Sequence, residues 1–121
     1  MQAPIHAWRG ARRSDWKTDP YVYVDLGASH TFSKVRLLTA HSGTLAWSSG
    51  FILAATANKF ASPADFTAPT AQQCGSTPSV LTGASAWNEF ECSSPITGRY
   101  VGFLVPGSSK IVCFCEIEVC V

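Results

Sequence analysis

Short runs of β-branched and aromatic residues, broken at close intervals by glycine or proline, constrain the fold of this chain more than any other feature. The 121 residues include seven prolines and nine glycines, and no long stretch between them combines helical apolar spacing with helix caps. Short strands separated by turn residues are typical of β-sandwiches. The sequence therefore predicts an all-β sandwich with strands at Tyr21–Leu26, Thr31–Thr39, Phe51–Thr56, Trp87–Cys92, Arg99–Val105 and Ile111–Val121.

The connections between these runs carry turn and loop signals. Pro106-Gly107 separates the last two predicted strands, which are expected to form a hairpin or to be near neighbours. The stretch Asn58–Ser85 is rich in small and polar residues and is expected to be a long surface excursion, with one short strand near Val80-Leu81. Such a loop needs a staple or a function, and a disulfide between Cys74 and Cys92 would supply the staple.

The N-terminal segment, residues 1–20, differs from the rest of the chain. It contains Trp8, Trp16 and a group of cations, and it does not alternate as a strand does. We predict a single domain over residues 1–121, in which residues 1–20 form a loop-like segment on a sandwich formed by residues 21–121.

Composition narrows the classes of function. Only 14% of the residues are charged and the formal net charge is +1, so no overall field attracts nucleic acid or an anionic membrane. No apolar run is long enough for a membrane-spanning helix, and residues 1–15 lack the apolar core of a signal peptide. Five cysteines without a Cys-x-x-Cys pair favour a secreted, disulfide-bonded domain over a zinc site. Secretion then requires that the chain is a fragment of a longer precursor.

Residue patterns typical of catalysis are missing from the sequence. There is no phosphate-binding loop, His-Glu-x-x-His motif or Ser/His/Asp set, and the eight carboxylates show no spacing typical of a tuned acid–base pair. One of them, Asp25, precedes Gly27 and is expected to cap a local backbone turn. We therefore predict that the domain is not an enzyme.

Several segments resemble one group of proteins in the same order along the chain. Tyr21–Gly27 followed by Phe32–Leu37 resembles the aromatic, Val-Asp-Leu-Gly strand pair of discoidin (F5/8 type C) domains. Similarity to the second half of the F-type, fucose-binding lectins lies in Cys74-Gly75, Phe90–Cys92, Gly98–Val101, Pro106-Gly107 and Cys115–Val119. The resemblance implies a jelly-roll β-sandwich of the galactose-binding-domain-like (discoidin) kind, a ligand site built from loops at one end, and a Cys74–Cys92 disulfide.

The fucose motif of the F-type lectins does not carry over to this chain. Those lectins hold fucose with one histidine and two arginines, whereas here Ser14 falls near the histidine, His41 at the first arginine and Trp47 near the second. The family's partner for the cysteine at Cys115 falls near Arg12, and about one N-terminal strand of the family is missing. The chain is therefore expected to be a fragment, or to cover the open sheet edge with another segment.

Two groups of residues are candidates for the ligand site. His41 and Trp47 flank a short glycine-containing loop and offer the hydrogen-bonding and stacking groups that sugar recognition uses. The alternative is a tryptophan folded onto the end of the sandwich beside a solvated histidine. Arg12, Arg13 and Trp16 belong to a basic, aromatic segment that suits an anionic sugar, sulfate or phosphate group, and the alternative is a solvated terminus.

The C-terminal strand carries the remaining candidates. Glu116 stands at the position of a calcium ligand in the lectins, so calcium is a candidate cofactor, while Glu116 and Glu118 also fit a solvated strand face. Cys113, Cys115 and Cys120 cannot pair with one another along one extended strand. They are expected to be buried free thiols, or to pair with another segment or another chain.

The leading hypothesis is a secreted carbohydrate-binding, lectin-like domain that recognises a glycan or glycoprotein through an altered site around His41, Trp47 and residues 12–16. The first alternative is a discoidin-type adhesion module that binds protein or phospholipid through the same loops, with Trp47 or Trp16 at a loop tip. The second is a structural accessory domain without a ligand of its own. An oligomer or a larger multidomain protein is a further possibility that the sequence leaves open.

Overall fold

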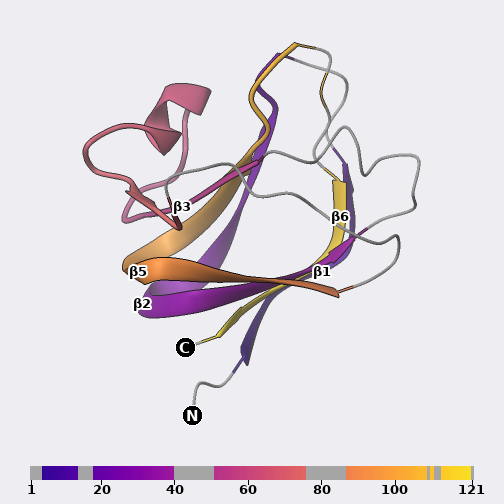
Figure 1. Cartoon of the computed structure of the whole chain (residues 1–121), viewed down its shortest axis with the longest axis vertical. Coiled ribbons are helices and arrows are strands. Elements are labelled where there is room, and N and C mark those ends of the chain that lie inside the picture. Colours follow the sequence, from indigo (N-terminus) through magenta and orange to yellow (C-terminus); the bar gives the residue numbers. More distant parts are fainter. Residues whose placement is uncertain are drawn as a thin grey trace.

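The computed structural model describes residues 4–13, 18–39, 51–75, 87–108, 110 and 113–120, with the backbone alone for residues 4–13, 39 and 113–116. All neighbouring strands in these ranges pair antiparallel, which confirms the all-β prediction (Figure 1). No helix in the described part is long and apolar enough to cross a membrane. The elements are β1 (Pro4–Arg13), β2 (Tyr21–Thr39), β3 (Ile52–Thr56), the 3-10 helix η1 (Pro63–Phe66), β4 (Gln72–Gln73), β5 (Trp87–Leu104) and β6 (Cys113–Cys120).

Two long strands, β2 and β5, run through both halves of the sandwich. The strand order is β1-β6-β2-β5-β3-β4, so β2 and β5 lie side by side at its centre. Their pairing is interrupted between Asp25 and His30, where both ribbons curve in Figure 1. The half before the interruption borders β3, and the half after it borders β6. One bent sheet thus supplies both layers.

The bend explains why the four shorter strands expected in these regions are two long ones. Gly27 has a φ of 83°, and its N–H donates to Asp25 Oδ1 at 2.8 Å, which confirms the predicted cap. The turn redirects the backbone without ending the strand, and β5 follows it through antiparallel pairing. Glycine at this point therefore marks a corner between layers rather than a strand terminus.

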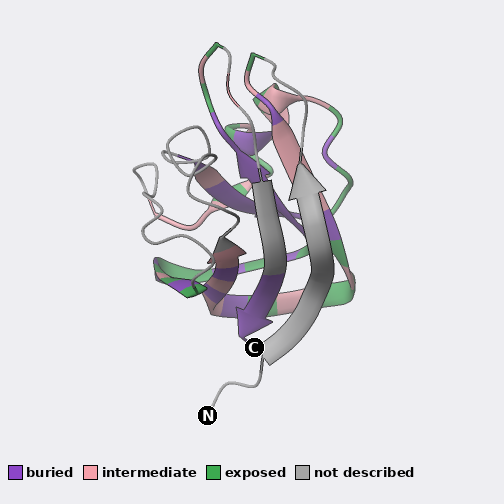
Figure 2. Ribbon diagram, turned by 90° about the vertical axis from the view of Figure 1, so that its right-hand side faces the viewer, coloured by how far each residue is buried: buried purple, intermediate pink, exposed green. Residues whose placement is uncertain are grey.

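The core lies between the two halves of the bent sheet. Val24 and Leu53 from one half and Val35 and Ile117 from the other belong to the same buried cluster, which alternating strand positions place on the inner face. Figure 2 shows buried segments, in purple, within the strands of the sandwich. The fully buried members include Phe32, Val35, Leu37, Phe51, Val101, Phe103, Ile117 and Val119.

A second, smaller cluster covers the outer face of the β2–β5–β3 half. The rings of Phe60 and Phe66 stack with centroids 4.2 Å apart, and both are buried. They come from the excursion that contains η1, and they pack with Tyr100 of β5. The part of this excursion that the structure describes is therefore a packed cover rather than a free loop, and the expected strand near Val80-Leu81 lies outside the described residues.

The prediction that residues 1–20 form a loop-like segment is wrong for residues 4–13. Residues Pro4–Arg13 form β1, which pairs antiparallel with β6 at the edge of the sheet. The pairing shifts between His6 and Trp8 and again between Arg9 and Arg12. These irregularities disturb the period of two on which strand recognition depends, so the sequence shows no clean alternation. The N-terminal segment covers the sheet edge that was expected to be open.

The strands on either side of Pro106-Gly107 are near neighbours rather than a hairpin, which is the second of the two expected arrangements. β5 pairs with β2 and β3, whereas β6 pairs with β2 and β1, so β2 separates the two strands. The connection crosses from one side of β2 to the other, as jelly rolls require. Gly107 has a φ of 121°, so the turn signal itself is real although the strands that it joins are not neighbours.

Candidate functional site

The strand ends that border the two predicted ligand loops lie at one end of the sandwich. Arg12 at the end of β1 and Thr39 at the end of β2 are both register partners of Phe114, from opposite sides of β6. Arg13 follows Arg12 and precedes residues 14–17, and Thr39 precedes residues 40–50. Both predicted loops therefore begin beside the same residue of β6.

The same two loops also end beside a single residue. Tyr21, which opens β2, and Ile52, which opens β3, are register partners of Leu104 from opposite sides of β5. Leu104 lies in the half of the sheet that borders β3, and Phe114 in the half that borders β1. Each loop therefore starts in one layer and ends in the other, so both cross the same end of the sandwich.

A clasp of backbone and side-chain hydrogen bonds fixes the base of this end. The Asp19 N–H donates to the Gly107 carbonyl at 2.8 Å, and the Gly107 N–H donates to Asp19 Oδ1 at 2.7 Å. The Val105 N–H donates to the Pro20 carbonyl at 3.0 Å. Asp19 has a φ of 49°, a left-handed conformation that Asp tolerates better than most residues. The chain entering β2 is thereby tied to the chain leaving β5.

The predicted ligand residues divide into two sets. The backbones of Arg12 and Arg13 lie at the loop end, where they face Phe114 and Cys113 of β6. Trp16, His41 and Trp47 lie outside the described residues. The structure thus brings together the places where the predicted site begins and ends, and the contacts of these five side chains stay a prediction.

The predicted calcium ligand Glu116 lies in the same region. Its backbone pairs with Arg9 on one side and with Leu38 on the other. Within the described ranges, no three His, Cys, Asp or Glu side chains gather as a metal site. Calcium binding at Glu116 therefore stays a prediction.

The outer face of the β6–β2–β5 half carries a charged and aromatic cluster that the sequence did not lead us to expect. Arg36 Nη1 donates to Glu118 Oε1 at 2.7 Å, and the Arg36 guanidinium carbon lies 4.6 Å from the centroid of the Trp87 ring. Glu118 is only 4% exposed, so the expectation that it lies on a solvated face is wrong. The ion pair with Arg36 offsets part of the cost of burying this carboxylate.

Trp87 is a residue whose role sequence reasoning missed, although a signal was present. In the run from Trp87 to Cys92, Trp87 alternates in phase with Glu89 and Glu91, while Phe90 and Cys92 occupy the other face. A tryptophan in phase with two glutamates is predicted to face solvent. The structure agrees, since Trp87 is 41% exposed.

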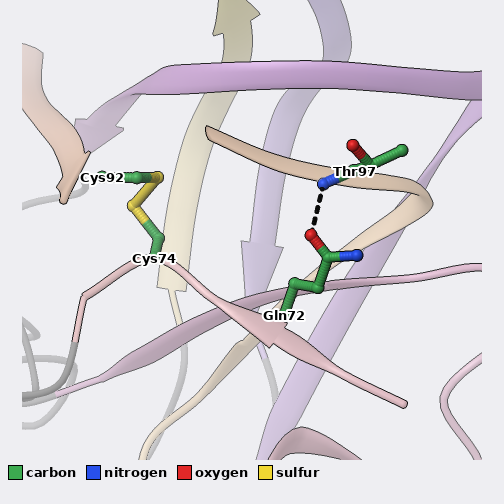
Figure 3. Close-up of a disulfide and its surroundings, with 4 residues drawn as sticks. All are labelled: Gln72, Cys74, Cys92 and Thr97. Atoms are coloured by element: carbon green, nitrogen blue, oxygen red, sulfur yellow. Dashed lines mark hydrogen bonds between the residues drawn. A yellow bond between two sulfur atoms is a disulfide. The ribbon is translucent and has the colours of Figure 1, made fainter. Parts of the chain in front are cut away.

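The predicted Cys74–Cys92 disulfide is present, with Cα atoms 4.4 Å apart. It joins the end of the η1 excursion to β5, and nearby the Thr97 N–H donates to Gln72 Oε1 at 3.0 Å (Figure 3). Cys120 is a buried free thiol, as one of the alternatives for the C-terminal cysteines predicted, and burial raises its pKa. The side chains of Cys113 and Cys115 lie outside the described part of the structure.

The opposite end of the sandwich is polar. Arg99 donates to Asp25 there, and a shallow depression of about 410 Å³ opens next to the end of β3. Asp65, which lines it, accepts hydrogen bonds from the N–H groups of Ala61 and Ser62 and so holds the start of η1. The other residues that line the depression are Thr56, Ala57, Asn58, Lys59 and Thr70.

Comparison with known proteins finds similar structures but no similar sequences. No family model and no curated protein sequence matches the chain. An F-type lectin (fucolectin) from striped bass (Morone saxatilis) serum superposes with a TM-score of 0.75 at 19% identity, covering 91% of this chain and 35% of the lectin. The lectin domain of lectinolysin, complexed with Lewis b antigen, gives a TM-score of 0.65 at 19% identity, covering 90% of this chain and 70% of that one.

Carbohydrate-binding modules give a similar result. The family 32 module of Clostridium perfringens NanJ, in complex with galactose, superposes with a TM-score of 0.65 at 11% identity and covers 100% of this chain and 93% of the module. The present chain thus spans about a third of the bass lectin and nearly all of this module. The chain has the galactose-binding-domain-like, jelly-roll β-sandwich fold that F-type lectins and these modules share.

Proposed function

We propose that this chain is a non-catalytic, extracellular domain that binds a glycan at the loop end of the sandwich. The observation that carries the proposal is the convergence of both predicted loops on Phe114 at one side and on Leu104 at the other. Two loops that cross the same end of a rigid sandwich bring their side chains within reach of one ligand. His41 and Trp47 on one loop, with Arg12, Arg13 and Trp16 around the other, would hold it.

The structural neighbours support a sugar as the ligand class. Their ligands include Lewis b, galactose and N-acetylgalactosamine-β-1,3-galactose. The neighbours differ in which sugar they hold, so they point to glycans in general rather than to fucose. The extracellular location is supported by the Cys74–Cys92 disulfide and by the serum origin of the bass lectin.

A glycan array tests the proposal. The wild-type protein, with folding confirmed by circular dichroism, is expected to bind at least one glycan, and the His41→Ala/Trp47→Ala variant is expected to lose that binding. The matched control is Asn58→Ala/Lys59→Ala, at the depression on the opposite end, which is expected to bind as the wild type does. A folded wild-type protein that binds no glycan contradicts the proposal.

The adhesion alternative is distinguished in the same preparation. Co-sedimentation with phosphatidylserine vesicles that Trp47→Ala abolishes, together with an empty glycan array, would identify a discoidin-type membrane-binding module instead. Binding to neither leaves the structural accessory role as the better description.

A further inference from the structure

Trp87 is the one large apolar side chain that is exposed among the residues the structure describes, at 41%. It is the first residue of β5, and its register partner is Leu38 of β2. Its backbone is therefore held in the sheet rather than in a loop. The exposed part of the tryptophan therefore has a fixed place on the sheet surface.

The environment of the ring fixes its orientation. The Arg36 guanidinium lies over the ring at 4.6 Å from its centroid, and the same guanidinium donates to Glu118 at 2.7 Å. Glu118 is itself buried, so this hydrogen bond holds the guanidinium in place. Arg36 thus covers one face of the indole, while Trp87 stays 41% exposed. An aromatic ring that is held in place by a cation and stays partly exposed is a preorganised stacking surface.

The charges around the ring indicate what kind of ligand suits it. Arg36 is paired with Glu118, and the Lys34 ammonium lies 3.8 Å from a carboxylate oxygen of Glu89. Among the described residues of this face, these two cations lie with three carboxylates, Glu89, Glu91 and Glu118, so the face offers no excess positive charge to an anionic ligand. It does offer hydrogen-bond acceptors in Glu89, which is exposed on the same face as Trp87. A neutral pyranose, with one apolar C–H face and hydroxyls at its rim, matches an aromatic plane beside such acceptors.

The position of Trp87 links it to the proposed glycan site. Leu38, the register partner of Trp87, lies one residue before Thr39. Thr39 ends β2, and the loop that contains His41 and Trp47 follows it in the sequence. Trp87 therefore lies on the sheet face that borders the loop end. We infer that Trp87, backed by Arg36, forms a second subsite that stacks on the sugar ring next to the one held by the loops. This inference rests on the proposed glycan-binding function.

Calorimetric titration with paired ligands of different length tests the inference. The pairs are galactose against N-acetylgalactosamine-β-1,3-galactose, and fucose against Lewis b. For the pair that the wild type binds, Trp87→Ala is expected to weaken the longer ligand about tenfold, the size of one lost aromatic contact. The monosaccharide, held by the loops alone, is expected to bind as tightly as before. Trp87→Phe, which retains an aromatic plane, is expected to recover much of the affinity for the longer ligand.

The controls separate the possible failures. Glu91→Ala changes an exposed residue of the same strand and face and is expected to leave both affinities unchanged. A variant that merely unfolds would lose the monosaccharide as well. Equal affinities of Trp87→Ala and wild type for the longer ligand, or an equal loss for both ligands, would overturn the second subsite while leaving the proposed function intact. A wild type that binds neither pair nor any arrayed glycan overturns the proposed function itself.

Discussion

Arg99 grips the carboxylate of Asp25 with two parallel hydrogen bonds, Nε to Oδ1 at 2.7 Å and Nη2 to Oδ2 at 2.9 Å. The two residues come from β5 and β2 at the corner where both strands pass from one layer to the other. The same Oδ1 accepts the N–H of Gly27, so one side chain both caps the turn and joins the two strands. The pair thus fixes the corner of the bent sheet at the end opposite the proposed site.

The first prediction concerns the pH dependence of this pair. The bonds from Arg99 and from the Gly27 N–H lower the pKa of Asp25 from 3.8 to about 2. A carboxyl group whose pKa is lowered by folding stabilises the protein above its unfolded pKa and loses that effect as the pH falls through the folded pKa. Asp25→Asn is therefore expected to lower the Tm at pH 6. The decrease should be small, because the pair is solvent-exposed. The difference from wild type should shrink between about pH 4 and pH 2. A difference that stays constant down to pH 2 contradicts the assignment.

The second prediction concerns the disulfide. Cys74 and Cys92 are 18 residues apart in sequence, and closing a loop of that size stabilises a protein by about 3 kcal/mol in the chain-entropy model. The Cys74→Ser/Cys92→Ser variant is expected to lose about that much free energy of unfolding, measured by urea denaturation. Cys120→Ala, which removes the buried free thiol, serves as the control that leaves the disulfide in place. An unchanged urea midpoint in the double variant would show that the bond does not contribute.

The third prediction concerns the contact between β5 and the η1 excursion. A Cβ atom on Gly102 would lie 2.7 Å from ring atoms of both Phe60 and Phe66. The two rings are stacked and buried, so neither can move away without disturbing the other. Gly102→Ala is expected to cost about 1–3 kcal/mol of stability, the range for overpacking.

A compensating variant checks the cause of that loss. Phe60→Leu, combined with Gly102→Ala, makes room for the added methyl group. The double variant should be more stable than the sum of the two single losses predicts, as a double-mutant cycle in urea would show. Strict additivity would indicate that the loss has another origin.

The fourth prediction concerns the buried carboxylate of Glu118. Its partner Arg36 is about one-third exposed. Replacing Arg36 removes a positive charge that compensates the buried negative charge of Glu118. Arg36→Met is expected to destabilise the domain by about 1–3 kcal/mol, the cost of losing a charged partner of a buried group. Glu118→Gln, which removes the buried charge as well, should restore part of that loss when added to Arg36→Met. A double variant that is less stable than Arg36→Met contradicts this account.

Those parts of the fold that alternation governs could be predicted from the sequence. Val35 and Leu37 point inward from β2, and the run from Trp87 to Cys92 alternates between core and solvent as the pattern requires. The Cys74–Cys92 bond was predictable because a long loop needs a staple and because the flanking motifs resemble those of F-type lectins. Local periodicity, loop length and the resemblance together were sufficient in these regions.

Features that depend on several strands together could not be predicted. β1 was missed because the register shifts at Trp8 and Arg12 break its alternation. The burial of Glu118 depends on Arg36, which is far away in sequence and becomes its neighbour only through the pairing of β6 with β2. The meeting of the two predicted loops likewise follows from the strand order, which no single segment encodes. The sequence could therefore propose ligand residues but not show that their loops share one end.

The pairing of β1 with β6 has a consequence for the order in which the domain can assemble. Pro4 is the register partner of Cys120, so β1 must wait for a strand that is made about 116 residues later. During synthesis on the ribosome, the backbone donors and acceptors through which β1 pairs with β6 have no native partner until β6 has emerged. Pairing over such a distance closes slowly, and an unpaired strand in the meantime is a template for association with other chains. Folding of this domain is thus expected to be completed only after β6 has left the ribosome, and chaperones that shield nascent chains have most to protect at β1.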